Sequence, residues 1–335
     1  IEEQKLGITA AGAIFAYLVE DTHHALLQHI TKIQSIPQDD YLMMDNFTLR
    51  NLEIVHSSNF QGKSLLDIID KTSTAMGGRL LRRRLILPLK SVNEINRRLS
   101  LIEFFNKEES LKFEILNLLK GISDLDRLVG KLAAEKISPK ELGYLRQSLI
   151  NIQKIRELLS SHHDVLAWLE PLNNLEELIS YLQNHLNEEL PVNLNKGNVI
   201  KSEVSEELDR LRNLQTKGKG FLDEMCQREI ERTGISSLKI DFNNVFGYYI
   251  EVRNTHKDKV PEDWIRKQTL VNAERYITEE LKEYETQILG AEEKISQIEH
   301  QLYRQVCENV MMYIDQIQEN SRLIAELDCA VSLSE

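Results

Sequence analysis

The chain has 335 residues, of which 41% are hydrophobic, 28% charged and only 6% aromatic. A chain of this length can bury one large core or two smaller ones, and its wealth of Leu, Glu, Lys and Gln favours helices over a sandwich or barrel. The formal net charge of −12 argues against wholesale wrapping of nucleic acid, although a local basic patch can still bind phosphate.

The cysteines and the apolar stretches indicate where the protein is located, and they do not indicate a disulfide framework or a metal site. Cys226, Cys307 and Cys329 stand far apart, without disulfide-framework or CxxC spacing, so we expect plain core thiols in a reducing compartment. No run of about 18 apolar residues could span a membrane, and AAGAIFAYLVE lacks the basic flank of a signal peptide. We therefore expect a cytoplasmic protein with no membrane partner. The opening IEEQKLG has no Met, as in an excised part of a longer protein.

The first 90 residues are predicted to be mostly helical. Residues 1–35 form one amphipathic helix that ends before Pro37. The stretch 41–55 begins as a short strand or extended arm and leads into a turn of helix. After an apolar helix face at 65–69, Thr72 or Thr74 caps a helix that ends near Pro88, because proline removes a backbone N–H group.

The middle of the chain is predicted to be an all-α domain. From Val92 to about Gln183 one helical pattern follows another. The breaks between these helices fall at Gly121, Ser138-Pro139, His162-His163 and Pro171. A polar turn region without helical period follows at 190–200.

Two later helices carry heptad seams. Leu208 and Leu211 are repeated by Leu222 and Met225 two heptads on. A second seam alternates steps of four and three and then slips at Val306; its members are Ile277, Leu281, Tyr284, Ile288, Ala291, Ile295, Ile298 and Leu302. Such a seam needs a second helix against it. We expect an antiparallel two-helix stalk, with a helix over 277–320 about 65 Å long; an ordinary bundle helix is the alternative.

Between the two seams the sequence becomes rich in β-branched and aromatic residues that alternate with polar ones. SLKIDF (237–242), FGYYIEV (246–252) and WIRKQTLV (264–271) are predicted strands, with Asn243 and Asn244 at the first turn. NAERYI then leads into the second stalk helix, capped by Thr278. Tyr248 and Tyr249 point to opposite faces, so at least one belongs to the core of the sheet. The predicted fold is mainly α: a multi-helix core with a long antiparallel two-helix stalk that carries a small β-sheet at its tip.

No motif in the chain indicates catalysis. QGKS (61–64) resembles the end of a P-loop, but Ser57 holds the position that needs glycine, so we expect a loop at a helix start. Adjacent histidines, as in His162-His163 and His23-His24, cannot share a helix face as metal ligands. We therefore expect no catalytic residue, no cofactor site and no metal site.

Two stretches could contact nucleic acid. One is the cluster GGRLLRRRL, whose arginines at 79 and 82–84 are expected mainly to pair with acidic neighbours. The other is the predicted sheet from Gly234 to Ile277, where seven cations and six acids leave a charge of +1 in a chain of −12. Amides and cations presented by a small sheet suit phosphate contacts. A tip that docks a protein would have a similar composition.

The chain resembles the MutS family of bacterial DNA mismatch-recognition proteins along essentially its whole length. The matching motifs, in order, are DNFTLRNLEI, TAMGGRLLRRRLILPL, DLDRL, ISPKELGYLRQSL, IERTGISSLKIDFNNVFGYYIEV, VPEDWIRKQTLVNAERYITEELKEYE and IAELD. It departs from the family pattern near Arg84, where many members carry an aromatic residue, and at Glu279, where many have proline.

The resemblance implies the middle portion of such a protein. By it, residues 1–218 are a helical core or lever with the outgoing stalk helix, 219–278 are a clamp, and 279–335 are the returning helix and the end of the core. In the family the clamps close on the backbone of double-stranded DNA without sequence preference. The levers join them to an ATPase domain, absent from this chain, that uses ATP and Mg. A second subunit and downstream mismatch-repair factors are the other expected partners.

The resemblance also suggests site residues. Asn243 and Asn272 match clamp residues that approach the phosphate backbone, whereas Lys239, Arg266, Lys267 and Arg275 are candidates from charge alone. Arg275 could equally pair within the tip. The alternatives to a DNA clamp are a coiled-coil module whose tip docks a protein, and a relative of the family that acts in recombination rather than mismatch repair.

Overall fold

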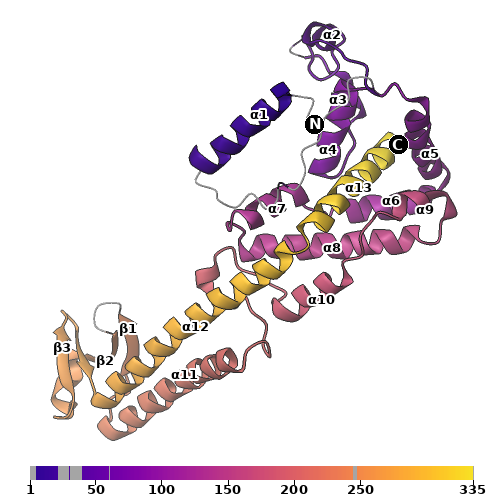
Figure 1. Cartoon of the computed structure of the whole chain (residues 1–335). Coiled ribbons are helices and arrows are strands. Elements are labelled where there is room, and N and C mark those ends of the chain that lie inside the picture. Colours follow the sequence, from indigo (N-terminus) through magenta and orange to yellow (C-terminus); the bar gives the residue numbers. More distant parts are fainter. Residues whose placement is uncertain (1–4, 22–29, 31–39, 60, 244–246, 335) are drawn as a thin grey trace. The chain divides into compact units, whose positions relative to one another are not determined.

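The computed structural model describes residues 5–21, 30, 40–59, 61–243 and 247–334. It is mainly helical with one small antiparallel sheet (Figure 1), as the sequence predicts. The chain divides into two compact units. We call Ile1–Asn193 with Gln305–Glu335 the helical unit, and Leu194–Arg304 the sheet unit.

The N-terminal segment differs in part from the prediction of one helix over 1–35. Helix α1 spans Lys5–Ala16 and continues as a π-helical turn over Tyr17–Asp21. The rest of the predicted helix, at 22–29 and 31–35, lies outside the described residues. No residue of α1 is buried, and Leu6 is 88% exposed. The apolar side chains of α1 therefore form no buried core among the described residues.

The next segment follows the prediction. Tyr41 lies in the predicted extended arm and forms an isolated β-bridge to Leu89. Asp45 then caps helix α2 (Asn46–Asn51). Ser64 of the QGKS stretch caps helix α3 (Leu65–Ile69) in a reciprocal capping box. The P-loop-like letters are thus a helix start, as expected. Thr74 caps helix α4 (Ala75–Ile86), which ends before Pro88.

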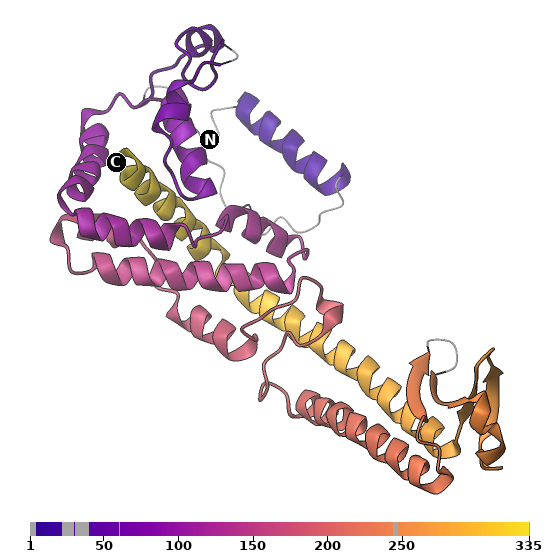
Figure 2. The same cartoon turned by 180° about the vertical axis from the view of Figure 1, so that it is seen from behind.

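The helical block is also as predicted. It consists of helices α5 (Val92–Lys107), α6 (Glu109–Leu119), α7 (Leu125–Ala133), α8 (Pro139–Leu159), α9 (Leu166–Leu169) and α10 (Glu176–His185). Helix α13 (Ile314–Leu333) packs on α4, α5, α6 and α7 (Figures 1 and 2). Because apolar residues occur on all sides of α13, most of the helix is buried.

A buried carboxylate joins α13 to the start of α4. Asp328 accepts hydrogen bonds from the backbone N–H groups of Ser73 (2.9 Å) and Thr74 (2.7 Å) and from the Thr74 hydroxyl (2.6 Å). Burial nevertheless raises the pKa of Asp328. Gly77 is required beside it, since a Cβ there would lie 2.2 Å from an Asp328 oxygen.

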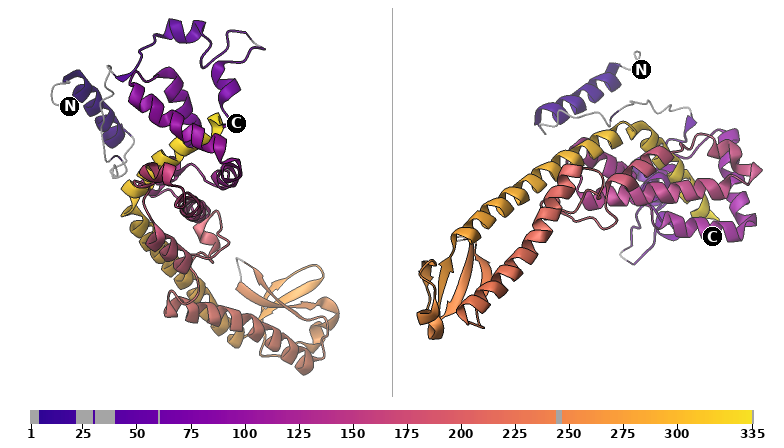
Figure 3. Two further views of the ribbon diagram at one scale, coloured as in Figure 1. Left: turned by 90° about the vertical axis from the view of Figure 1, so that its right-hand side faces the viewer. Right: turned by 90° about the horizontal axis from the view of Figure 1, so that it is seen from below.

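The sheet unit is built on two long helices. Helix α11 (Glu206–Thr233) and helix α12 (Glu279–Met311), most of which belongs to this unit, lie side by side (Figure 3). Residues further along α11 contact residues earlier in α12, so the two helices are antiparallel, as the heptads predict. These contacts join Arg212 with Glu299, Gln215 with Glu292, Phe221 with Tyr284, and Arg228 with Glu280.

The sheet that lies between these helices in the sequence has four strands rather than the predicted three. They are β1 (Lys239–Asn243), β2 (Gly247–Arg253), β3 (Ile265–Thr269) and β4 (Ala273–Ile277), in the order β1-β2-β4-β3. The prediction took NAERYI as a lead into the helix, but most of it is strand β4. Thr278 does cap α12, because its hydroxyl accepts from the N–H of Leu281 at 3.1 Å.

The predicted continuous helix over 277–320 is wrong at its start, where Ile277 belongs to β4, and at one point within it. The backbone N–H groups of Met312 and Tyr313 donate to residues three positions back, at 3.2 and 3.0 Å, instead of four. This tighter turn ends α12 at Met311, and α13 begins at Ile314. The apolar seam had already slipped at Val306, next to the division between the two units.

We predict that Asp328→Ala destabilises the helical unit by about 3 kcal/mol, because three buried donors lose their acceptor. Gln316→Ala, at an exposed position of the same helix, is the control and should change stability little. Urea unfolding followed by circular dichroism measures both. Equal stabilities for the two variants would contradict a structural role for Asp328.

Candidate functional site

The inner face of the sheet is the core of the sheet unit. Ile250, Val252 and Tyr276 pack there with Met225 of α11 and Leu281 of α12, and all five are buried. Burial of this kind is worth roughly 1.5–3 kcal/mol for each large side chain. It fixes which face of the sheet lies against the helices and which face remains available to a ligand.

Gly247 allows the sheet to approach α12 closely. Its φ of +76° is left-handed, and a Cβ there would lie 2.1 Å from a carboxylate oxygen of Glu285. The backbone N–H of Tyr248 donates to that carboxylate at 3.1 Å. The ring of Tyr248 lies edge-on to Tyr284 of α12 (5.7 Å between centroids). Tyr248 is therefore part of the packing, as predicted for at least one of the two tyrosines.

A row of polar side chains crosses the outer face of the sheet. The register pairs Lys239 with Glu251, Glu251 with Arg275, and Arg275 with Gln268. The Arg275 guanidinium donates to Glu251 (3.2 Å) and Gln268 (3.0 Å) and lies 4.2 Å from the centre of the Tyr249 ring. Arg275 thus pairs within the sheet, which was one of the two possibilities left open by the sequence.

The other two cationic candidates of β3 lie elsewhere. Arg266 is opposite Tyr276 in the register, so it belongs to the inner side, where it contacts Glu274 at 3.4 Å. Lys267 occupies the irregularity between Arg266 and Gln268 and is exposed. No ion-pair partner of Lys267 occurs among the described residues. Of these two, only Lys267 presents an uncommitted charge.

The two asparagine candidates lie at opposite ends of the sheet. Asn243 is the last residue of β1 and pairs with Gly247, whereas Asn272 lies in the β3–β4 turn, where its carbonyl accepts from Asn254 at 3.1 Å. Strand geometry separates the two asparagines by roughly 25 Å. Asn244, the other turn residue, lies outside the described residues. The structure therefore does not bring the two asparagines together into one small site.

Several exposed cations of the sheet unit form no ion pair within the described residues. Its acids Glu251, Glu274 and Asp263 are paired with arginines. In the stretch 234–277, the described cations without such a partner are Lys239, Arg253, Lys257, Lys259 and Lys267, and the acids without one are Asp241, Asp258 and Glu262. Arg253 was not among the sequence candidates, although alternation along β2 places it on the same face as Tyr249 and Glu251. Unpaired cations therefore outnumber unpaired acids in this stretch, because Asp263 pairs with Arg232 of α11, outside it.

The described part of the helical unit offers fewer signs of a site. Of the arginine cluster, Arg79 pairs with Asp124 (2.7 Å) and Asp126 (2.9 Å), as expected, and it holds the pKa of Asp124 below its usual value. The expectation is wrong for Arg82, Arg83 and Arg84, which form no ion pair within the described residues. His162 lies edge-on to Phe104 (5.4 Å between centroids), whereas His23 and His24 lie outside the described residues. Within the described ranges, no group of His, Cys, Asp and Glu could hold a metal ion.

No helix of the described ranges is both long and apolar enough to cross a membrane.

Comparison with known proteins identifies relatives of this chain. Residues 47–334 match the family described as MutS domain III. The chain is 53% identical to the DNA mismatch repair proteins MutS of Flavobacterium johnsoniae and of Flavobacterium psychrophilum, and 47% identical to that of Parabacteroides distasonis. Each match covers the whole of this chain but only 38–39% of the relative. The chain thus corresponds to a middle part of those proteins.

We predict that Arg275→Ala lowers the stability of the sheet unit by about 1–2 kcal/mol. Tyr249 loses its cation–π contact with Arg275, and Glu251 loses its ion pair. Lys267→Ala, at the position next to Gln268 of this row, should leave stability unchanged. Hydrogen exchange of the β2 and β4 amides measures the difference. Equal exchange rates in both variants would refute the prediction that Arg275 stabilises the sheet.

Proposed function

The chain belongs to the MutS family, and from that premise we propose that its sheet unit grips double-stranded DNA by the sugar–phosphate backbone, without preference for sequence. The observation that carries this proposal is the excess of exposed cations without partners on and around the sheet. Cations and amides that contact phosphates position a protein on DNA but read no bases.

The spacing of the candidate residues also supports an extended ligand. Asn243 and Asn272 are roughly 25 Å apart by strand geometry, which corresponds to about seven base pairs along the axis of a duplex. A small molecule could not reach both residues, whereas a nucleic-acid backbone could. We propose that Lys239, Lys267 and Arg253 contact the same backbone. Arg275 and Arg266 contribute less, because each already pairs with a carboxylate of the sheet.

The long helices have a role in this proposal as well. Residues 219–278 form the clamp, and 1–218 with 279–335 form the lever that links DNA grip to an ATPase domain in another part of the family protein. ATP and Mg act in that domain, so this part of the protein catalyses no reaction itself. A second subunit supplies the opposite clamp, and downstream mismatch-repair factors are further partners. The protein acts in the cytoplasm. The antiparallel pairing of α11 with α12 supports a stiff link.

Two other functions would use the same surface. A coiled-coil module could dock a protein on the sheet, and a family member could act in recombination rather than mismatch repair. The high identity to proteins named for DNA mismatch repair favours the repair function. Duplex binding distinguishes the clamp from the protein-docking module.

We predict weak, sequence-independent binding of the chain to duplex DNA that falls steeply with salt. If about four phosphates are contacted, a fourfold rise in salt concentration should weaken binding about a hundredfold. Lys267→Ala should reduce the logarithmic salt slope by about one, whereas Lys107→Ala, an exposed lysine of the helical unit, should not. Fluorescence anisotropy provides the measurement. Absence of binding at low salt would favour protein docking instead.

We also predict that Asn243→Ala combined with Asn272→Ala weakens DNA binding of the full-length protein about tenfold, through lost hydrogen bonds. Matched and mismatched duplexes should be affected alike, because backbone contacts carry no base information. Asn93→Ala with Asn106→Ala, both exposed on α5, is the control pair. Loss of mismatch preference with unchanged affinity for matched DNA would sink the proposed role.

A further inference from the structure

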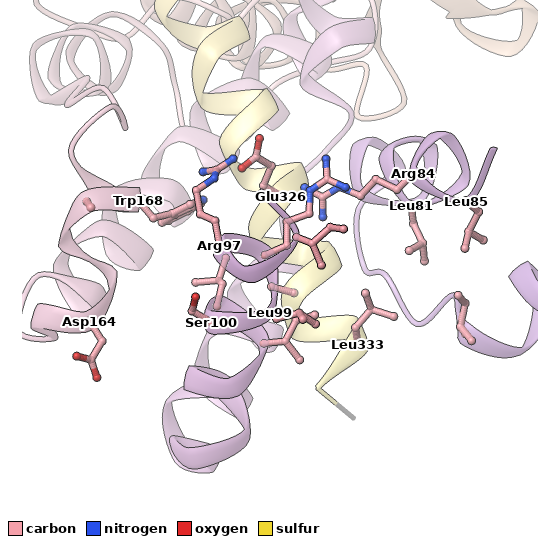
Figure 4. A pocket seen from close by; sticks show the side chains of 17 residues that line it. Leu81, Arg84, Leu85, Arg97, Leu99, Ser100, Asp164, Trp168, Glu326 and Leu333 are labelled. Atoms are coloured by element: carbon pink, nitrogen blue, oxygen red, sulfur yellow. The ribbon is translucent and has the colours of Figure 1, made fainter. Parts of the chain in front are cut away.

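A pocket in the helical unit is separate from the proposed DNA grip. It has a volume of about 380 Å³ and lies among helices α3, α4, α5, α9 and α13. Figure 4 shows Leu81, Leu99 and Leu333 along its wall together with Arg84 and Trp168. The wall is mostly apolar, and the volume is that of a small-molecule site.

Three N–H groups at this pocket have no acceptor among the described residues. They are the Nε groups of Arg84 and Arg98 and the indole Nε1 of Trp168, and all three atoms are buried. A buried donor without a partner costs about 1–3 kcal/mol, and most native donors are satisfied. Three such donors from separate helices around one cavity indicate a missing acceptor in that cavity.

The charges at the pocket indicate that this acceptor is an anion. Within the described residues, neither Arg84 nor Arg98 has an ion-pair partner. Burial and the nearby charge of Arg84 lower the pKa of Arg98. Glu326, in the pocket wall, partly offsets this effect on Arg98, but its carboxylate also pairs with Arg322 at 2.6 Å. Arg97 likewise pairs with Glu94 at 3.1 Å.

Asp164 also lines this pocket, at its α9 side. Within the described residues, its carboxylate forms no ion pair with Arg84 or Arg98, and Asp164 is exposed to solvent. The two guanidinium groups therefore have only one nearby carboxylate among the described lining residues, that of Glu326, which Arg322 shares. The leucines line the space for an apolar group.

We propose that this pocket binds a small monocarboxylate with an apolar body, such as an arylalkanoic acid. The carboxylate accepts from the Nε groups of Arg84 and Arg98 and from the Trp168 indole, and the apolar body lies against Leu81, Leu99 and Leu333. A phosphate dianion is disfavoured, because its desolvation in an apolar cavity costs more and needs more donors than these. Charge-assisted hydrogen bonds of this kind are about twice as strong as neutral ones.

The two tryptophans of the chain provide the test. With ¹⁵N-labelled tryptophan, the indole signal of Trp168 should shift saturably on addition of 3-phenylpropionate, whereas that of Trp264, in the sheet unit, should not. Trp168→Phe assigns the two signals. The neutral analogue 3-phenyl-1-propanol has nearly the same shape, and it should need about a tenfold higher concentration.

Variants of two arginines complete the experiment. Arg98→Met should weaken binding of 3-phenylpropionate about tenfold, whereas Arg83→Met, exposed on α4 and outside the pocket, should have no effect. If Arg98→Met does not fold, Arg84→Met gives the same comparison. The proposal is overturned if the alcohol binds as well as the acid, if Trp168 does not respond, or if Arg83→Met loses binding equally. Tighter binding of acetyl-Leu-Glu-Leu-amide than of the free acid would also overturn it, in favour of a polypeptide occupant.

Discussion

The packing of one sheet face against α11 and α12 is the interaction on which the proposed function depends. Ile250, Val252 and Tyr276 can be buried only if the alternate residues of their strands face away from the helices. Gly247 permits this contact, because any side chain there would collide with Glu285. The remaining face is therefore presented as a rigid surface, and its polar residues are held in a fixed register.

Ion pairing then decides which charges of that surface are available. Residues 234–277 contain seven cations and six acids, so composition alone predicts little net charge for the sheet. Glu251 and Glu274 pair with Arg275 and Arg266, however, and those arginines stiffen the sheet instead of meeting a ligand. Lys239 and Lys267 keep their charges at the surface. A weakly charged segment can thereby present a positive surface in a strongly acidic chain.

Local features of the fold were predictable from sequence, whereas features that depend on register were not. Thr74 and Thr278 cap helices as predicted, because a cap depends on residues within one turn. Strand β4 was missed, because AERYI becomes a strand only by pairing on both sides, with β2 and β3. The separation of Asn243 from Asn272 follows from strand order, and the unpaired Arg84 and Arg98 follow from helix packing. Neither arrangement leaves a periodic signal in the sequence.

The most direct test of the DNA grip is a map of the residues that a short duplex perturbs. The amide signals of the isotopically labelled chain would be followed during titration with a duplex of random sequence at low salt. The account predicts changes at Lys239, Arg253, Lys267 and Asn272, and none at Ile250 or Leu281 on the packed side. Changes confined to the helical unit, or no changes at all, would contradict it.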